Sequence, residues 1–110
     1  MKIDTAVSLL GALAQGSRLA LFRLLVQKGP DGMAAGEIAE RLGVAPNTLS
    51  FHLKELSSVG LLKSRQEGRF IYYAPDFKVM NGLLAYLTEN CCADSKTAAE
   101  CATPASCKEC

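Results

Sequence analysis

The apolar positions of this chain recur mostly at helical spacing. Near the N-terminus, Ile3, Val7 and Leu10 fall at i, i+4 and i+7, the positions that share one face of an amphipathic helix. Glycine and proline separate this segment from later segments of the same period, because both residues interrupt helices. The pattern therefore predicts four helices before residue 60, at residues 3–14, 18–27, 36–42 and 46–59.

Short segments between these helices indicate where each begins and ends. Gly16 and Ser17 break the chain and supply an N-cap for the second helix, and residues 29–32 end it as a turn. Gly43 closes the third helix, and Pro46 suits the first position of the fourth. The second helix is expected to be buried through Leu19, Phe22, Leu25 and Val26.

After residue 60 the pattern changes to that of strands. Residues 62–67 and 70–74, the second segment rich in aromatic side chains, lie on either side of Gly68 and predict a hairpin. The arms and turn of this hairpin carry Lys63, Arg65 and Arg69. Residues 76–89 return to helical spacing, with apolar positions at Met80, Leu83, Leu84 and Leu87.

Two short helices joined by a three-residue turn and followed by a basic hairpin predict a winged helix-turn-helix. This is a mainly α fold with a small β-hairpin, in which the second helix of the pair enters the major groove of DNA. At about 100° per residue, Leu49, Leu53 and Leu56 lie on one side of that helix, and the opposite side is mostly short and polar. The candidate DNA-binding residues of the helix are Asn47, Thr48, Ser50, Phe51 and Lys54, with Ser58 on the same side.

Several of these side chains have two interpretations. Phe51 lies opposite the leucines, so it contacts a thymine methyl group or packs against the hairpin. His52, the only histidine, is interpreted as a hydrogen-bonded packing residue rather than a ligand or catalyst. Lys63, Arg65 and Arg69 are solvated strand residues or phosphate contacts, and their place beside a reading helix favours phosphate contacts.

These segments together resemble the ArsR/SmtB family of metal- and metalloid-responsive repressors. The resemblance covers about residues 3–89 and is carried by ALAQGSRLALFRLL, EIAERLGVAPNTLSFHLKELSSVGLL and EGRFIYYAP, with the motif T-x-S-x-H-L-x-x-L at Thr48 to Leu56. It implies a homodimer joined by the first and last helices, which binds double-stranded operator DNA and leaves it when an inducer binds. The dimer-interface residues are then Ile3, Val7, Leu10, Met80, Leu83, Leu84 and Leu87.

Charge and cysteine divide the chain into two parts. Twelve Lys and Arg against eleven Asp and Glu give a net charge of +1, so any DNA contact must come from local patches. Residues 1–88 carry ten basic and seven acidic side chains, whereas residues 89–110 carry two and four and hold all five cysteines. We therefore expect a DNA-binding and dimerisation domain at residues 1–89 and a flexible cysteine-rich sensor tail at residues 90–110.

A membrane protein is excluded by the same pattern, because no apolar run approaches the about 18 residues needed to span a bilayer. Residues 6–14 follow Lys2 and end in A-x-A, as a signal peptide would. However, Asp4 interrupts the positive region that such a peptide needs, and the apolar stripe belongs to a helix of the fold. We therefore expect a cytoplasmic protein whose thiols stay reduced.

The cysteines are the candidate inducer ligands. The family's arsenic and cadmium sensors place a C-x-C pair at the start of the third helix, but residues 33–37 contain no cysteine. Its zinc sensors use Asp and His on the last helix, but no histidine follows His52. Thiolate-only ligation selects soft ions, and trivalent arsenic or antimony takes three sulfurs. As(III), with Sb(III) as a second inducer, is therefore expected at Cys91, Cys92 and Cys101, with Cys107 as the alternative third ligand.

This arrangement resembles the arsenic-responsive subgroup that places a Cys-Cys pair and a nearby third cysteine after the last helix. DNA binding itself is expected to need no cofactor. The role of Cys110 and the operator sequence stay open. The alternative is a repressor that responds to another thiophilic metal (Cd, Pb, Hg or Zn) or to thiol oxidation.

Two further uses of the cysteines are less well supported. Cys92 and Cys101 with the pair Cys107 and Cys110 could form a zinc site, but the spacing matches no standard knuckle. C-x-x-C is also the motif of thiol-disulfide oxidoreductases, but here it ends the chain and encloses the acidic Glu109, which disfavours a reactive thiolate. Since no nucleophile–base pair or phosphate-binding loop is evident, we expect no enzyme.

Overall fold

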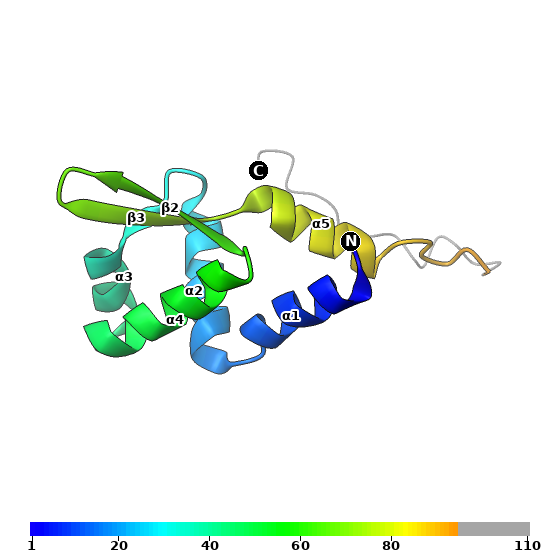
Figure 1. The fold of residues 1–110 in the computed structure, drawn as a ribbon, viewed down its shortest axis with the longest axis horizontal. Coiled ribbons are helices and arrows are strands. Elements are labelled where there is room, and N and C mark those ends of the chain that lie inside the picture. Colours follow the sequence, from blue (N-terminus) through cyan, green and yellow to red (C-terminus); the bar gives the residue numbers. More distant parts are fainter. Residues whose placement is uncertain (95–110) are drawn as a thin grey trace.

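The computed structural model describes residues 1–94 of the 110-residue chain. Within these residues, a small antiparallel sheet lies at one edge of a group of helices; its hairpin projects at one end of the molecule, and the last helix leads toward the other (Figure 1). In chain order, the elements are α1 (Ile3–Leu13), α2 (Gly16–Lys28), β1 (Met33–Ala34), α3 (Ala35–Leu42), α4 (Pro46–Ser58), β2 (Leu62–Glu67), β3 (Phe70–Pro75) and α5 (Phe77–Leu87).

The predicted winged helix-turn-helix is confirmed. Every predicted helix is present, and its ends agree with the sequence pattern to within two residues. The hairpin forms as β2 and β3, in a register that pairs Leu62 with Pro75 and Glu67 with Phe70. The pattern missed β1, because a strand of two residues is too short to show a period. This strand pairs with β3, so the sheet has the order β1-β3-β2.

The core lies where α2, α3 and α4 meet one another and the sheet. Helix α2 buries Leu21, Phe22 and Leu25, while Leu19, which was predicted to be buried, is exposed. This prediction was wrong because Leu19 lies about 200° around the helix from Leu21. The buried apolar side chains are Ala6, Leu9, Leu21, Phe22, Leu25, Met33, Ile38, Leu49, Leu53, Leu56, Leu61, Leu62, Ala74 and Leu83.

A tight joint connects α1 to α2. The N-cap of α2 is Gln15 rather than the predicted Ser17, and its side-chain oxygen accepts a hydrogen bond from the backbone N–H of Arg18 at 2.8 Å. The Arg18 Nε atom in turn donates to the carbonyl of Ala12 at 2.6 Å, which ties the end of α1 to the start of α2. The two helices meet at an angle of 99°.

Among residues 1–94, no single helix is long and apolar enough to cross a membrane. Only the bent pair of α1 and α2, taken together, reaches the length and hydropathy of a span.

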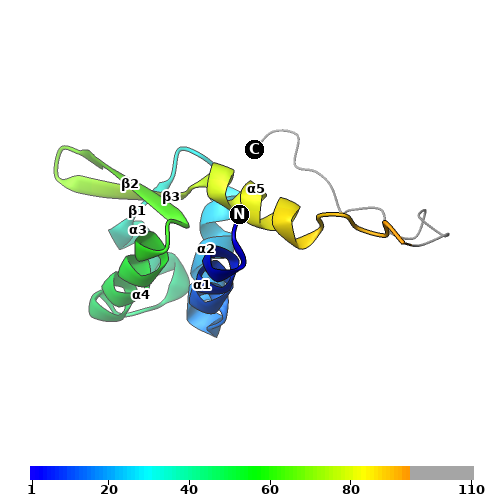
Figure 2. The same ribbon diagram turned by 45° about the vertical axis from the view of Figure 1, so that its right-hand side comes forward.

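Helices α1 and α5 lie together at the end of the molecule away from the hairpin (Figure 2). Met80 is half-buried, and Leu83 is only 5% exposed because it packs into the core of its own chain. Leu83, which the resemblance places in the dimer interface, is therefore buried within its own chain. The remaining predicted interface residues form an exposed apolar face, which consists of Ile3, Val7, Leu10, Leu84 and Leu87.

Candidate nucleic-acid interface and thiol pair

A short turn places α4 directly after α3. Gly43 ends α3 in the left-handed conformation, with φ 65°, which glycine adopts at little cost. Pro46 lies in the first turn of α4, where its missing N–H leaves no hydrogen bond unmade. Residues 43–45 therefore join the two helices in a helix-turn-helix unit, as the sequence predicted.

The two sides of α4 differ in exposure and chemistry. Leu49, Leu53 and Leu56 are buried, so they fix the helix on the core. The division of α4 into a core side and an outer side is thereby confirmed, while contact of the outer side with DNA stays a prediction. All the predicted DNA-binding residues of this helix are exposed: Asn47, Thr48, Ser50, Phe51 and Lys54, together with Ser58.

The two rings at the centre of α4 lie in different surroundings. Phe51 is 56% exposed, so the hairpin does not cover it. His52 is 7% exposed, and its ring centroid lies 5.9 Å from that of Phe51. Within residues 1–94, the buried Nδ1 atom of His52 has no hydrogen-bond partner, so the histidine packs as predicted but without the expected hydrogen bond at that atom.

The wing, formed by β2 and β3, exposes every residue of β2 after Leu62. Lys63 and Arg69 are exposed, and within the part of the chain that the structure describes neither has an ion-pair partner. Phe70 and Ile71 are also exposed, because the end of the hairpin extends beyond the core. These two apolar residues were not predicted as site residues, although their position near Gly68 at the tip of a hairpin could have indicated them.

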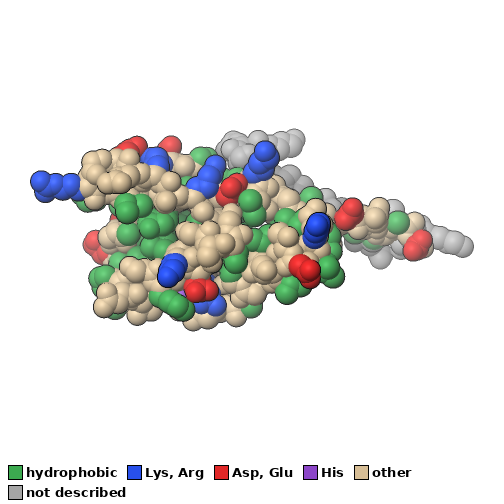
Figure 3. All heavy atoms as spheres, in the orientation of Figure 1, with side chains coloured by type: hydrophobic (Ala, Val, Ile, Leu, Met, Phe, Trp, Pro, Cys, Tyr) green, Lys and Arg blue, Asp and Glu red, His purple; other side chains and the backbone are tan. Residues whose placement is uncertain are grey.

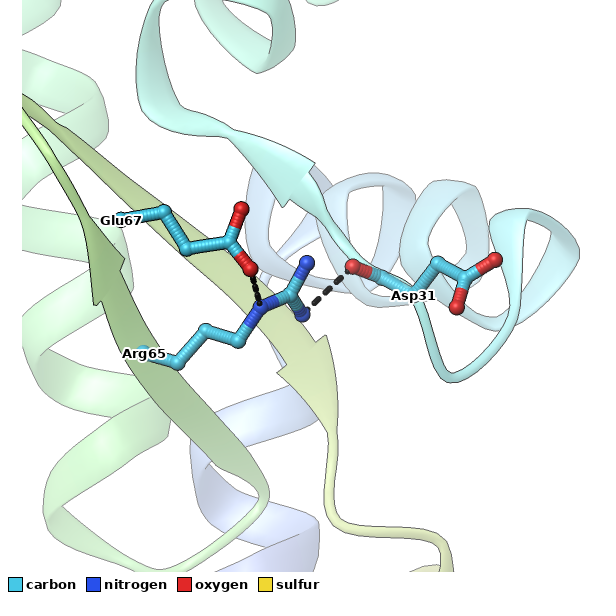
Figure 4. A network of polar contacts seen from close by, with 3 residues as sticks. All are labelled: Asp31, Arg65 and Glu67. Carbon is cyan, nitrogen blue, oxygen red and sulfur yellow. Dashed lines mark hydrogen bonds and ion pairs between the residues drawn. The ribbon is translucent and has the colours of Figure 1, made fainter.

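Arg65 differs from the other basic residues of the wing, because its guanidinium has partners in the chain (Figure 4). The Nε atom donates to a carboxylate oxygen of Glu67 at 2.9 Å, and Nη1 donates to the backbone carbonyl of Asp31 at 2.7 Å. The guanidinium carbon also lies 4.8 Å from the centroid of the Tyr72 ring. A phosphate would have to compete with these contacts for the guanidinium.

Charge on the face drawn in Figure 3 lies in small patches. Basic side chains are separated from one another there and interspersed with acidic ones. This face therefore agrees with the net charge of +1 and offers individual phosphate contacts rather than one broad basic field.

Cys91 and Cys92 follow the end of α5. Backbone bonds continue the turn beyond the helix, and the N–H of Cys91 donates to the carbonyl of Thr88 at 2.9 Å. Asn90 and Cys92 have left-handed backbones, with φ 58° and 60°, a conformation that non-glycine residues adopt only at some cost in energy. This turn brings the two sulfur atoms to 3.6 Å from each other.

Within residues 1–94, no third Cys, His, Asp or Glu completes a metal site beside this pair. The predicted ligands Cys101 and Cys107, as well as Cys110, lie outside the described residues. The structure therefore brings together two of the predicted ligands.

Comparison with known proteins places this arrangement in a family. Residues 13–65 match the family described as a helix-turn-helix domain. The transcriptional repressor SdpR of Bacillus subtilis is 30% identical over 69% of this chain and 81% of its own length. A homodimeric winged helix-turn-helix DNA-binding domain from Mycobacterium bovis, described as a possible ArsR-family regulator, is 32% identical, with a TM-score of 0.63 over 81% of this chain and 82% of its own.

A third similar protein of known structure is described as a possible transcriptional regulator for arsenical resistance. It is 29% identical, with a TM-score of 0.62 over 73% of this chain and 79% of its own. The family match at residues 13–65 covers α2, α3, α4 and the first part of β2. The chain therefore belongs to the winged helix-turn-helix transcriptional regulators of the ArsR type.

Proposed function

We propose that this regulator binds operator DNA as a homodimer and is released from it when trivalent arsenic binds the thiolates at the end of α5. The observation that carries the proposal is the 3.6 Å separation of the sulfur atoms of Cys91 and Cys92. Two sulfurs bound to one ion through bonds of about 2.3 Å lie about 3.4 to 3.8 Å apart when the bond angle is between about 95° and 109°. Cys92 is disulfide-bonded in this structure, so the two sulfurs become two donors of one soft ion when that disulfide is reduced.

A third sulfur would complete the pyramidal site that trivalent arsenic requires. Cys101 is our first choice for this ligand and Cys107 our second, and both lie outside the described residues. The similarity to a protein described as a possible regulator of arsenical resistance supports the same class of inducer. Antimonite has the same preference for thiolates and is proposed as a second inducer.

DNA recognition is assigned to α4 and the wing. The exposed side of α4 carries donors and acceptors such as Asn47 and Ser50, which suit the base edges of the major groove. Lys63 and Arg69 of the wing are proposed to contact phosphates, since both are exposed and have no ion-pair partner within residues 1–94. Arg65, the third predicted phosphate contact, already has partners in its own chain.

Dimerisation is assigned to the exposed apolar face of α1 and α5. The face joins large side chains from both ends of the described chain, and a second copy of the same face would cover them. The M. bovis relative is homodimeric, which supports this assembly. A dimer would present two copies of α4 to successive major grooves, about 34 Å apart.

The proposed inducer site directly follows α5, which carries part of the proposed interface. Leu84 and Leu87 of the apolar face lie seven and four residues before Cys91. Binding of an ion by Cys91 and Cys92 would therefore change how α5 packs in the dimer. A change in that packing would alter the relation between the two α4 helices. A typical coupling of about 1 to 3 kcal/mol would weaken DNA binding by about 5- to 150-fold.

The proposal is tested with a fluorescent DNA duplex that the protein selects from a random pool. Binding is followed by fluorescence anisotropy while arsenite, antimonite, cadmium, zinc or peroxide is added to the complex. We expect arsenite and antimonite to release the duplex at the lowest concentrations and a small dithiol in excess to restore binding. Release by peroxide alone would replace the arsenic proposal with a sensor of thiol oxidation, and release by cadmium or zinc alone would identify a sensor of those metals.

A further inference from the structure

Arg65 reaches across the whole width of the sheet. It lies on β2, the outer strand, and its direct partner on the middle strand β3 is Tyr72. Tyr72 is in turn the partner of Ala34 on β1, so the three residues form a row that crosses the three strands. The guanidinium lies over the Tyr72 ring. It donates to the carbonyl of Asp31, in the turn that precedes β1 (Figure 4).

That turn is held closely against the sheet. Gly32 has φ 78°, and a Cβ atom at this position would lie 2.7 Å from the carbonyl oxygen of Tyr73 on β3. The pairing that follows is short, because β1 forms only the pairs Met33 with Tyr73 and Ala34 with Tyr72. The contact of Arg65 with the turn therefore adds a third attachment to a ladder of two residue pairs.

The segment attached in this way leads directly into the DNA-reading unit. Strand β1 ends at Ala34, and α3, the first helix of the helix-turn-helix, begins at Ala35. No residue separates the two elements, so the position of β1 on the sheet sets the position of α3 relative to the wing. Helix α3 packs against α4, so the contact of Arg65 with the turn before β1 also helps to fix the angle between the wing and α4.

We infer that Arg65 is a positioning residue, which holds the wing at a fixed angle to the helix-turn-helix and does not itself contact DNA. Its contacts outside β2 are the bond to the Asp31 carbonyl and the cation–π contact with Tyr72, whereas Glu67 lies on the same strand, so the pair with Glu67 does not attach the turn. Lys63 is the contrasting case, because it lies on the same face of β2 and has no ion-pair partner within residues 1–94.

The inference differs from a direct phosphate contact in its response to lysine. A lysine keeps the positive charge, so Arg65→Lys would preserve most of a phosphate contact. It lacks the planar fork that lets the arginine stack on Tyr72 while it donates from two nitrogen atoms, so it would not preserve the attachment. The expected effect of Arg65 on DNA affinity rests on the proposed function, whereas its attachment of the turn does not. One of the two measurements is therefore made without DNA.

The first measurement is hydrogen exchange of residues 29–34 in the free protein. We expect exchange in Arg65→Lys and Arg65→Gln to be about three- to tenfold faster than in the wild type. Lys63→Gln, two residues away on the same strand, and Glu67→Gln, which keeps both contacts of Arg65 outside β2, are expected to leave exchange unchanged. Thermal unfolding of each variant confirms that the domain is folded.

The second measurement is affinity for the selected duplex as a function of salt. Arg65→Lys and Arg65→Gln are expected to bind about three- to tenfold more weakly with an unchanged salt slope, whereas Lys63→Gln lowers the slope by about 0.9, because one phosphate is no longer neutralised. Two results would overturn the inference and make Arg65 a phosphate contact. One is that Arg65→Lys exchanges and binds DNA like the wild type, and the other is that Arg65→Gln lowers the salt slope of DNA affinity. If the wild type bound no duplex, the DNA-binding function would fail, and exchange of residues 29–34 would still decide whether Arg65 fastens the turn.

Discussion

Leu87 offers the clearest test of the proposed dimer, because it lies on the exposed apolar face and contributes nothing to the buried core. Its side chain is 54% exposed in the single chain, so replacing it should not unfold the domain. Fully burying a leucine is worth about 1.5 to 3 kcal/mol, so covering the exposed half in a dimer is worth about 0.8 to 1.5 kcal/mol. A symmetric dimer contains the residue twice, which gives about 1.6 to 3 kcal/mol for Leu87→Ser.

This loss corresponds to a dimer that dissociates about 15- to 150-fold more readily, since each 1.4 kcal/mol changes an equilibrium constant tenfold. Sedimentation equilibrium over a range of protein concentrations measures the dissociation constant directly. Phe70→Ser is the matched control, because Phe70 is 60% exposed but lies on the wing, away from α1 and α5. An unchanged dissociation constant in Leu87→Ser, or an equal increase in Phe70→Ser, would refute the assignment of the interface.

Three further predictions follow from the exposed and buried sides of the fold. Leu83→Ala should lower the free energy of unfolding, measured by urea denaturation, by about 2 to 5 kcal/mol, because Leu83 packs in the core of its own chain. A decrease below about 0.5 kcal/mol, the size of an ordinary surface substitution, would place Leu83 outside that core. Gly32→Ala should also destabilise the fold, because its Cβ would meet the carbonyl of Tyr73, and an unchanged melting temperature would contradict this packing. Asn47→Ala should weaken binding to the selected duplex by about 1 to 3 kcal/mol, whereas Arg69→Ala should lower affinity for every DNA sequence and reduce the salt slope of that affinity. A reduced salt slope in Asn47→Ala, or a changed sequence preference in Arg69→Ala, would contradict the assignment of base contact to Asn47 and phosphate contact to Arg69.

The helices and the hairpin could be predicted from the sequence because each extends over enough residues to show its period. Helix α4 is the best example, since three leucines on one side and polar residues on the other define both its core contact and its outer face. Strand β1 could not be predicted, because two residues carry no period and its pairing with β3 depends on contacts distant in the chain.

Side-chain surroundings were harder to predict than secondary structure. Leu83 and Leu84 are neighbours with equal hydrophobicity, yet the first is buried and the second exposed, because the stripe of α5 is shared between its own core and an outer face. The partners of Arg65 were equally inaccessible, since one of them, the Asp31 carbonyl, is 34 residues away in sequence. Within residues 1–94, the Nδ1 atom of His52 has no hydrogen-bond partner. This could not be predicted either, because it depends on which side chains surround the ring in the folded core.

The central claim is that thiolates at the end of α5 bind the inducer that releases DNA, and one measurement tests it most directly. Arsenite is titrated into complexes of the selected duplex with wild-type protein and with the Cys91→Ser, Cys92→Ser and Cys110→Ser variants. The account predicts equal DNA affinity before arsenite is added, release from the wild type and from Cys110→Ser, and no release from Cys91→Ser or Cys92→Ser. Normal release from both Cys91→Ser and Cys92→Ser would contradict it.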